Sequence, residues 1–264
     1  MNLRLENKRA LVTGSTGGIG FAIAEALLKE GASVIINGRT EKRVNDALRK
    51  LRSLGVSGSS EGIAADLGTA EGAQSIIRRF AEVDILVNNL GIFAPKPFEQ
   101  ISDADWLRLF EVNVLSGVRL SRHYLGGMKD RGWGRIVFIS SESAIQIPAE
   151  MIHYGMTKTA QLAISRGLAE TTAGTKVTVN TVLAGPTASE GAMEFVGRLA
   201  REQQTDVAAI EKEFFRSMRP TSLLKRFVQP EEVAALVVFV CSPVSSATNG
   251  AALRADGGVV RSIV

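Results

Sequence analysis

A tyrosine and a lysine stand four residues apart in the segment YGMTK, as Tyr154 and Lys158. If the segment is helical, their phenol and ammonium groups lie on the same face. A free tyrosine has a pKa near ~10, and a cation about 4 Å away at an effective dielectric near 20 lowers it by up to ~3 units. The pair therefore predicts a tyrosine that exchanges a proton near neutral pH. A tyrosine packed under a lysine stem on a surface helix is the alternative.

Three of the glycines in the segment TGSTGGIG, residues 13–20, are spaced for a turn between a strand-like and a helix-like stretch. Gly14, Gly18 and Gly20 carry no Cβ, so the backbone can approach a pyrophosphate there, and the following helix N-terminus offers free N–H groups. The spacing differs from the generic G-x-G-x-x-G fingerprint. The segment predicts a phosphate-binding turn, and a turn without a ligand is the alternative.

Short β-branched runs alternate with longer helix-like segments along the whole chain, which is typical of βαβ units and a parallel sheet. The predicted strands are residues 9–13, 33–37, 62–65, 84–89, 135–140, 176–182 and 251–255, and the predicted helices are 18–31, 41–53, 70–80, 103–125, 152–171 and 230–241. We therefore expect an α/β fold with a doubly wound, seven-stranded parallel sheet flanked by helices, in a single domain over residues 1–264.

One segment, residues 188–219, interrupts this alternation with a helical pattern of its own. Ligands of open α/β sheets bind beyond the carboxyl ends of the strands, and this segment follows the sixth strand. We expect a small helical lid over a substrate site, and one more packed helix pair is the alternative.

Composition argues against several classes of function. The 264 residues carry a net charge of +4, but the cations are spread along the chain without a basic run, so we expect no nucleic-acid partner. His123, His153 and Cys241 are far apart, so we expect no metal site. The most apolar run, 233–241, is too short to span a bilayer, so we expect no membrane partner. A single cysteine and the lack of an apolar leader favour the cytoplasm.

Seven segments together resemble the single-domain short-chain dehydrogenase/reductase family, and in particular its oxoacyl carrier-protein reductase and ketoreductase branch. In chain order they are TGSTGGIG at 13–20, ADL at 65–67, NNLG at 88–91, EVNV at 111–114, ISS at 139–141, YGMTK at 154–158 and LRADGG at 253–258. The resemblance covers nearly the whole chain. It implies a Rossmann-type fold, a nicotinamide cofactor and an oxidoreductase that acts on a small-molecule carbonyl or alcohol.

The resemblance also implies a catalytic tetrad. Ser141 would hold the substrate carbonyl oxygen, Tyr154 would be the acid/base, and Lys158 would assist it. Asn113 would hold a water that links the lysine to solvent. Negative charge develops on the carbonyl oxygen during hydride transfer, so a hydrogen-bond donor and a proton at that oxygen act where the transition state needs them.

Carried over in the same way, Asp66 would contact adenine and Thr187 the nicotinamide carboxamide, although Leu90 replaces an alanine and Gly185 precedes Pro186 where the family has Pro-Gly. The full set of expected cofactor-binding residues is Gly14, Ser15, Thr16, Gly18, Ile19, Gly20, Gly38, Arg39, Thr40, Asp66, Leu67, Asn88, Gly91, Tyr154, Lys158, Gly185 and Thr187.

The end of the second predicted strand favours NADP(H). An NAD enzyme places an acid there for the ribose hydroxyls, whereas this chain has Gly38 followed by Arg39. The expected function is an NADP(H)-dependent ketone reductase. An NAD-dependent alcohol dehydrogenase of the same fold and a non-catalytic NADP(H)-binding regulatory protein are the alternatives. Phenylalanine and methionine residues in 188–219 favour an apolar or aromatic ketone, and the direction of the reaction stays open.

A homotetramer is the expected assembly, since family members that resemble this chain are commonly homotetramers. The predicted helices 103–125 and 152–171 carry apolar residues on more than one face, and the tail GGVVRSIV would expose valine and isoleucine unless a neighbour covers them.

Overall fold

Seven parallel strands form one sheet in the order β3-β2-β1-β4-β5-β6-β7. The computed structural model describes residues 2–56 and 58–263. The strands are β1 (Arg9–Val12), β2 (Ser33–Gly38), β3 (Ser60–Ala64), β4 (Ile85–Asn88), β5 (Gly134–Ser141), β6 (Val177–Ala184) and β7 (Ala252–Ala255). The order reverses between β1 and β4, so the doubly wound sheet is confirmed and a crevice is expected beyond the carboxyl ends of those strands.

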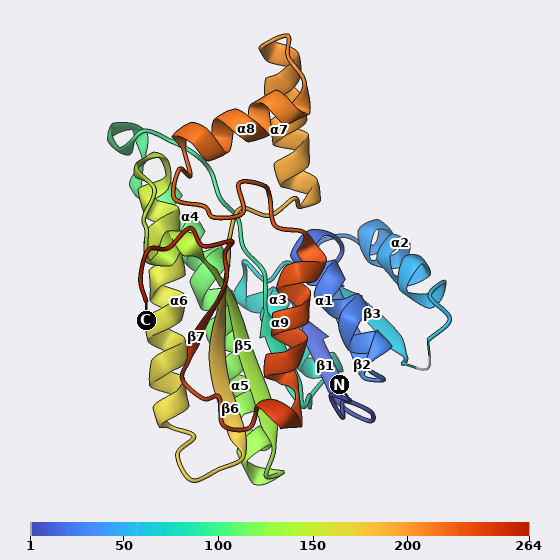
Figure 1. Cartoon of the computed structure of the whole chain (residues 1–264). Coiled ribbons are helices and arrows are strands. Elements are labelled where there is room, and N and C mark those ends of the chain that lie inside the picture. The colour runs from blue at the N-terminus through green and yellow to red at the C-terminus, as the bar shows by residue number, and fades with distance from the viewer. Residues whose placement is uncertain (1, 57, 264) are drawn as a thin grey trace.

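Helices cover both faces of the sheet (Figure 1). On one face lie α1 (Gly18–Lys29), α2 (Glu41–Arg52) and α9 (Pro230–Cys241). On the other lie α3 (Ala70–Arg79), α5 (Ser116–Asp130) and α6 (Ile152–Glu170). Short 3-10 turns occur at Phe98–Gln100, Glu142–Ala144, Ala149–Met151 and Pro243–Ser245. Among the residues that the structure describes, no helix combines the length and the apolar character needed to cross a bilayer.

Strand β1 shows why the sequence reads as continuous hydrophobic runs. Ala10 and Val12 pack in the core under α1 and α9, whereas Leu11 between them packs in the core under α3 and α5. A parallel strand covered by helices on both faces buries every side chain, so no polar residue alternates with the apolar ones.

The predicted helix 103–125 is longer than expected and is not uniform. It consists of α4 (Asp103–Phe110), a π turn (Glu111–Leu115) and α5, which ends at Asp130. Two glycines at 126 and 127 do not end the helix, because Met128 beyond them is fully buried against the sheet. The π turn contains Asn113 and widens the helix at one of the predicted site residues.

The helical insertion is confirmed as α7 (Glu190–Glu202) and α8 (Val207–Ser217). Its two helices share a small core of their own, made by Val196, Ala200, Ile210, Phe215 and the following Phe227. Figure 1 shows this pair, in orange, standing beyond the carboxyl ends of the strands. The insertion is therefore placed over the end of the sheet where ligands bind.

The expectation of an apolar exposed tail is wrong for two residues. Val259 and Val260 are buried within the chain, and the Val260 amide donates to the Asp256 carboxylate at 3.0 Å. Ile263 is exposed, as expected. Val264 lies outside the described residues. The tail therefore contributes one exposed apolar side chain among the residues described.

Candidate active site

A cavity of about 740 Å³ opens at the carboxyl ends of the strands, between the sheet and the insertion. Most of the predicted site residues line it: Gly14, Thr16, Gly18, Ile19, Gly20, Gly38, Arg39, Asp66, Leu67, Gly91, Ser141, Tyr154, Lys158, Gly185 and Thr187. Segments that lie far apart in the sequence therefore meet at one site, as the doubly wound topology requires.

The glycine-rich turn has the geometry of a phosphate cradle. Gly14 and Gly18 adopt positive φ angles of 59° and 55°, and a Cβ on Gly20 would lie only 2.5 Å from the Gly14 carbonyl oxygen. No side chain caps the N-terminus of α1, so its first amide groups face the cavity without a protein acceptor from a cap. These features fit the pyrophosphate of a dinucleotide.

Three predicted cofactor residues do not line the cavity. Ser15 is fully buried, and its hydroxyl bonds to backbone groups of β1 and β2 at 2.6 and 3.0 Å. The Thr40 hydroxyl caps the N-terminus of α2. The Asn88 amide donates to Ser121 in α5 at 3.1 Å. These side chains hold the scaffold together, and their contacts with a cofactor stay predictions.

Tyr154 and Lys158 lie on the first two turns of α6, so the predicted shared helical face is confirmed. The Lys158 Nζ is buried and donates to the Ile139 carbonyl oxygen at 2.9 Å. It lies 5.7 Å from the centroid of the Tyr154 ring. Gly91 lies three residues after the end of β4, and a Cβ there would come within 3.3 Å of this ammonium and crowd it.

The expected direction of the tyrosine pKa is wrong for this structure. Burial raises the pKa of Tyr154 above its ordinary value, and the Glu142 carboxylate raises it further, while Ser141 and Arg219 lower it. Burial also lowers the pKa of Lys158 to about 8. The simple distance argument failed because it left out the loss of water around both groups and a carboxylate that faces the phenol.

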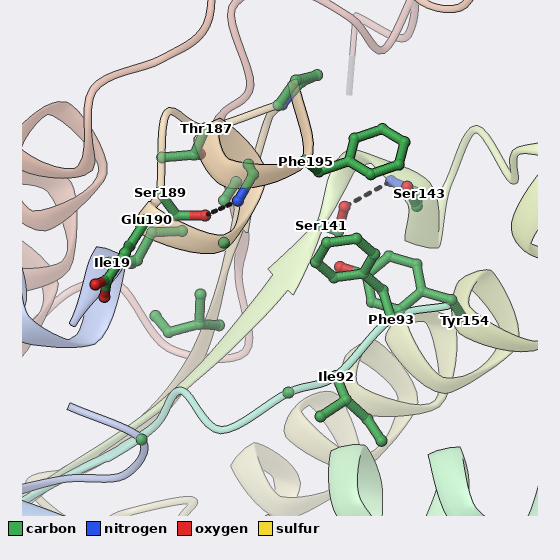
Figure 2. Close-up of a pocket in the computed structure, with 18 of the residues that line it drawn as sticks. Ile19, Ile92, Phe93, Ser141, Ser143, Tyr154, Thr187, Ser189, Glu190 and Phe195 are labelled. Atoms are coloured by element: carbon green, nitrogen blue, oxygen red, sulfur yellow. Dashed lines mark hydrogen bonds between the residues drawn. The ribbon is translucent and has the colours of Figure 1, made fainter. Parts of the chain in front are cut away.

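Ser141 ends β5, and its hydroxyl is already engaged. It donates a short hydrogen bond to the Glu142 carboxylate and accepts one from the Ser143 amide at 3.1 Å. Figure 2 shows the bond to Ser143 and places Ser141 beside the rings of Tyr154 and Phe93. Glu142 in turn accepts from the Arg219 Nε at 2.9 Å. The serine is therefore held by a buried charged pair that the sequence did not predict.

The side-chain amide of Asn113 is also engaged in hydrogen bonds within the protein. Its side chain exchanges two hydrogen bonds with the backbone of Ile92, at 2.8 and 2.9 Å, and donates a third to Thr157 at 3.0 Å. Its own carbonyl oxygen accepts from Gln161, whose side-chain oxygen lies 3.4 Å from the Lys158 Nζ. The connection between Asn113 and Lys158 therefore runs through Gln161. A role for Asn113 in holding a water stays a prediction.

Gly38 ends β2 just before Arg39, and Thr16 packs closely against it. A Cβ on Gly38 would approach the Thr16 methyl group to 2.4 Å, so this position accepts a side chain only if Thr16 moves. Arg39 is exposed and lines the cavity. Arg43 lines it too, and lies 3.7 Å from the Glu190 carboxylate at the start of α7. Both Arg39 and Arg43 therefore line the cavity, whereas the sequence pointed first to Arg39 alone.

Sequence reasoning missed further residues of the site: Phe93, Glu142, Gln161, Phe195 and Arg219. Phe93 packs edge-to-face on Tyr154 with ring centroids 6.2 Å apart. Figure 2 shows Phe195 projecting from α7 above the same region. Gln161 had a local signal, because it stands one helical turn after Lys158 on the same face. Arg219 had no local signal in the sequence, because its partner Glu142 is 77 residues away.

A family model described as short chain dehydrogenase matches residues 8–198. The chain belongs to this family. This short-chain dehydrogenase is therefore an oxidoreductase that acts on alcohol and carbonyl groups.

Known proteins resemble this short-chain dehydrogenase over their whole length. It is 52% identical to the uncharacterized oxidoreductase YvaG of Bacillus subtilis, covering 100% of both chains. It is 33% identical to the 3-oxoacyl-[acyl-carrier-protein] reductase FabG of Aquifex aeolicus, covering 98% of this chain and 100% of that one. Among solved structures, L-sorbose reductase from Gluconobacter frateurii, complexed with NADPH and L-sorbose, superposes with a TM-score of 0.93 at 30% identity and full coverage of both chains.

Proposed function

We propose that this short-chain dehydrogenase is an NADP(H)-dependent ketone reductase, which transfers a hydride between the nicotinamide and a carbonyl or secondary alcohol carbon. The observation that carries the proposal is the meeting of Ser141, Tyr154 and Lys158 with the glycine cradle in one cavity. The NADPH in the sorbose reductase complex and the ketone substrate of the FabG reductase agree with it. One domain over residues 1–264 would do this work, since strands from Arg9 to Ala255 share one sheet.

The geometry suits the reductive direction. A bound NADPH supplies the hydride. The raised pKa of Tyr154 keeps its phenol protonated before the reaction, so the proton that the new alkoxide oxygen needs is in place. Ser141 offers its hydroxyl hydrogen to the same oxygen. The Lys158 ammonium, held by the Ile139 carbonyl, then favours the phenolate that remains.

Two alternatives stay open to experiment. A regulatory protein that only binds NADP(H) has no need of an acid/base, yet Tyr154 and Lys158 are both present beside the cavity. An NAD-dependent alcohol dehydrogenase would use the same residues in the oxidative direction. We propose the cytoplasm as the location, where the single cysteine, buried Cys241, would stay reduced.

Replacing Tyr154 with phenylalanine tests whether the protein is a reductase. Tyr154→Phe removes the transferable proton and keeps the ring, so we expect kcat for ketone reduction with NADPH to fall by ~10²–10⁴. The NADPH dissociation constant, measured by fluorescence, should change little. Tyr124→Phe is the matched control, because Tyr124 is the other of the two tyrosines and donates to the Phe80 carbonyl within the core. A Tyr154→Phe enzyme with more than a tenth of wild-type kcat would contradict the assignment.

Removing Arg39 tests the choice of cofactor. The 2′-phosphate of NADPH carries up to two negative charges that an arginine fork can bind. A charge-assisted hydrogen bond contributes ~1.5–3 kcal/mol, so we expect Arg39→Ala to weaken NADPH binding roughly tenfold to a hundredfold and to leave NADH nearly unaffected. The measurement is kcat/KM for both cofactors, with Arg43→Ala in parallel. A wild type that prefers NADH, or an unchanged ratio in Arg39→Ala, would refute the role of Arg39. If the NADPH to NADH ratio of kcat/KM is unchanged in Arg39→Ala but falls in Arg43→Ala, then Arg43 is the phosphate ligand.

Introducing an acid at position 38 should reverse the preference from NADPH to NADH. A carboxylate at position 38 repels the 2′-phosphate and accepts the ribose hydroxyls of NADH. Since a Cβ there would collide with the Thr16 methyl group, the variant is best made as Gly38→Asp with Thr16→Ser. Thr16→Ser alone is the control. We expect the double variant to favour NADH in the same kcat/KM assay, and continued preference for NADPH would refute the proposed role of position 38.

We propose a homotetramer as the assembly. The support is that α4 exposes Leu107 and Phe110, and the tail exposes Ile263. Apolar surface of this kind is commonly covered by a second copy in symmetric oligomers. Light scattering at micromolar concentration should give four times the chain mass of 28.2 kDa. A monomer mass would contradict the proposal.

A further inference from the structure

A buried cluster of charges lies beside the catalytic serine, and the proposed reaction does not account for it. We call Glu142, Glu150 and Arg219 the Glu142 cluster. Arg219 donates through Nε to Glu142 at 2.9 Å and through Nη1 to Glu150 at 3.0 Å. The side chains of Glu142 and Arg219 are only 5% and 8% exposed, and all three residues line the cavity.

Arg219 joins the insertion to the catalytic strand end, because it follows α8 while Glu142 follows β5. Burial alone would lower the pKa of Arg219, but the two carboxylates raise it above its ordinary value. One cation between two carboxylates leaves a formal charge of −1 on the cluster. The wall of the cavity beside the serine is therefore anionic and rich in hydrogen-bond acceptors.

The hydrogen bonds of Glu142 make substrate binding depend on whether the substrate carries a hydrogen-bond donor. One carboxylate oxygen accepts from Arg219 and the other accepts from the Ser141 hydroxyl. A serine hydroxyl has a single hydrogen. When Ser141 turns that hydrogen toward the carbonyl oxygen of a substrate, the second oxygen of Glu142 loses its donor. A buried carboxylate oxygen without a donor is unfavourable, so a substrate that brings a donor of its own is preferred.

We propose that Glu142 determines substrate specificity and selects ketones that carry a hydroxyl group on the carbon next to the carbonyl. This inference rests on the proposed function. The carbonyl oxygen lies with Ser141 and Tyr154, and the neighbouring hydroxyl donates to the oxygen of Glu142 that the serine has released. A plain alkyl ketone offers no donor, and a keto acid brings a second negative charge to an anionic wall.

Other groups on the same cavity wall suit a substrate with more than one hydroxyl. Beyond the Glu142 cluster, Glu213 adds a carboxylate acceptor, and Ser143 and Ser217 add hydroxyl groups. Phe93 and Phe195 present aromatic rings to the same cavity. The apolar or aromatic ketone that the sequence pattern favoured would leave these polar groups without partners from the substrate.

Matched substrates test the proposal on the wild-type enzyme. Hydroxyacetone and 2-butanone differ only by a hydroxyl in place of a methyl group, as do acetoin and 3-methyl-2-butanone. With NADPH, we expect kcat/KM to be roughly tenfold to a hundredfold higher for the hydroxyketone of each pair, as one charge-assisted hydrogen bond allows. Equal values, or higher values for the alkyl ketones, would overturn this inference and leave the reductase proposal intact. No turnover of any of the four ketones would overturn both.

A variant then assigns the preference to Glu142. Glu142→Gln keeps the size of the side chain and removes its charge, so we expect the ratio of kcat/KM between hydroxyketone and alkyl ketone to fall at least tenfold. Glu194→Gln, on an exposed part of α7, is the matched control and should keep the wild-type ratio. An NADPH-binding measurement verifies that the variant is folded. A folded Glu142→Gln enzyme with the wild-type ratio would overturn the role of Glu142, and if the variant does not fold, the wild-type pairs still decide on the substrate class.

Discussion

The site depends on one buried ammonium group. Lys158 loses its water where α6 meets the end of β5, and such a loss is unfavourable unless fixed acceptors replace the water. The Ile139 carbonyl and the Gln161 side chain supply them, and the absence of a side chain on Gly91 avoids crowding the ammonium. The parallel sheet makes this possible, because its carboxyl ends bring the three segments to the same place.

The second constraint is the competition for the hydrogen of Ser141. In the structure this hydrogen is directed to Glu142, which Arg219 holds from the far side. In the proposed reaction a substrate would take the hydrogen away, so the affinity of the site for a ketone would depend on what replaces that bond. In the proposed reaction this arrangement would couple the insertion to Ser141, since Arg219 stands two residues after the end of α8.

Features with a local signature could be predicted from the sequence. The glycine-rich turn, the four-residue spacing of Tyr154 and Lys158, and the seven apolar runs all follow from short-range backbone geometry. Features that depend on distant partners could not. Nothing near residue 142 indicates Arg219, nothing near the tail indicates that Val259 and Val260 are buried, and the direction of the Tyr154 pKa depends on burial that appears only after folding. The same limit explains why α5 continues past two glycines to bury Met128.

The central claim is that Tyr154 is a protonated phenol in the empty enzyme and becomes the acid/base once the cofactor is bound. The chain has two tyrosines, and the pKa of Tyr124 is raised by burial to about 12. Any tyrosinate that forms well below that pH in the NADP⁺ complex therefore belongs to Tyr154. We predict no tyrosinate below about pH 10 in the free protein, because burial raises both pKa values. With NADP⁺, whose nicotinamide ring is positively charged, we predict one tyrosinate with a midpoint below about pH 9 that is absent in Tyr154→Phe. An enzyme that reduces ketones but shows no such tyrosinate with NADP⁺ would contradict the account.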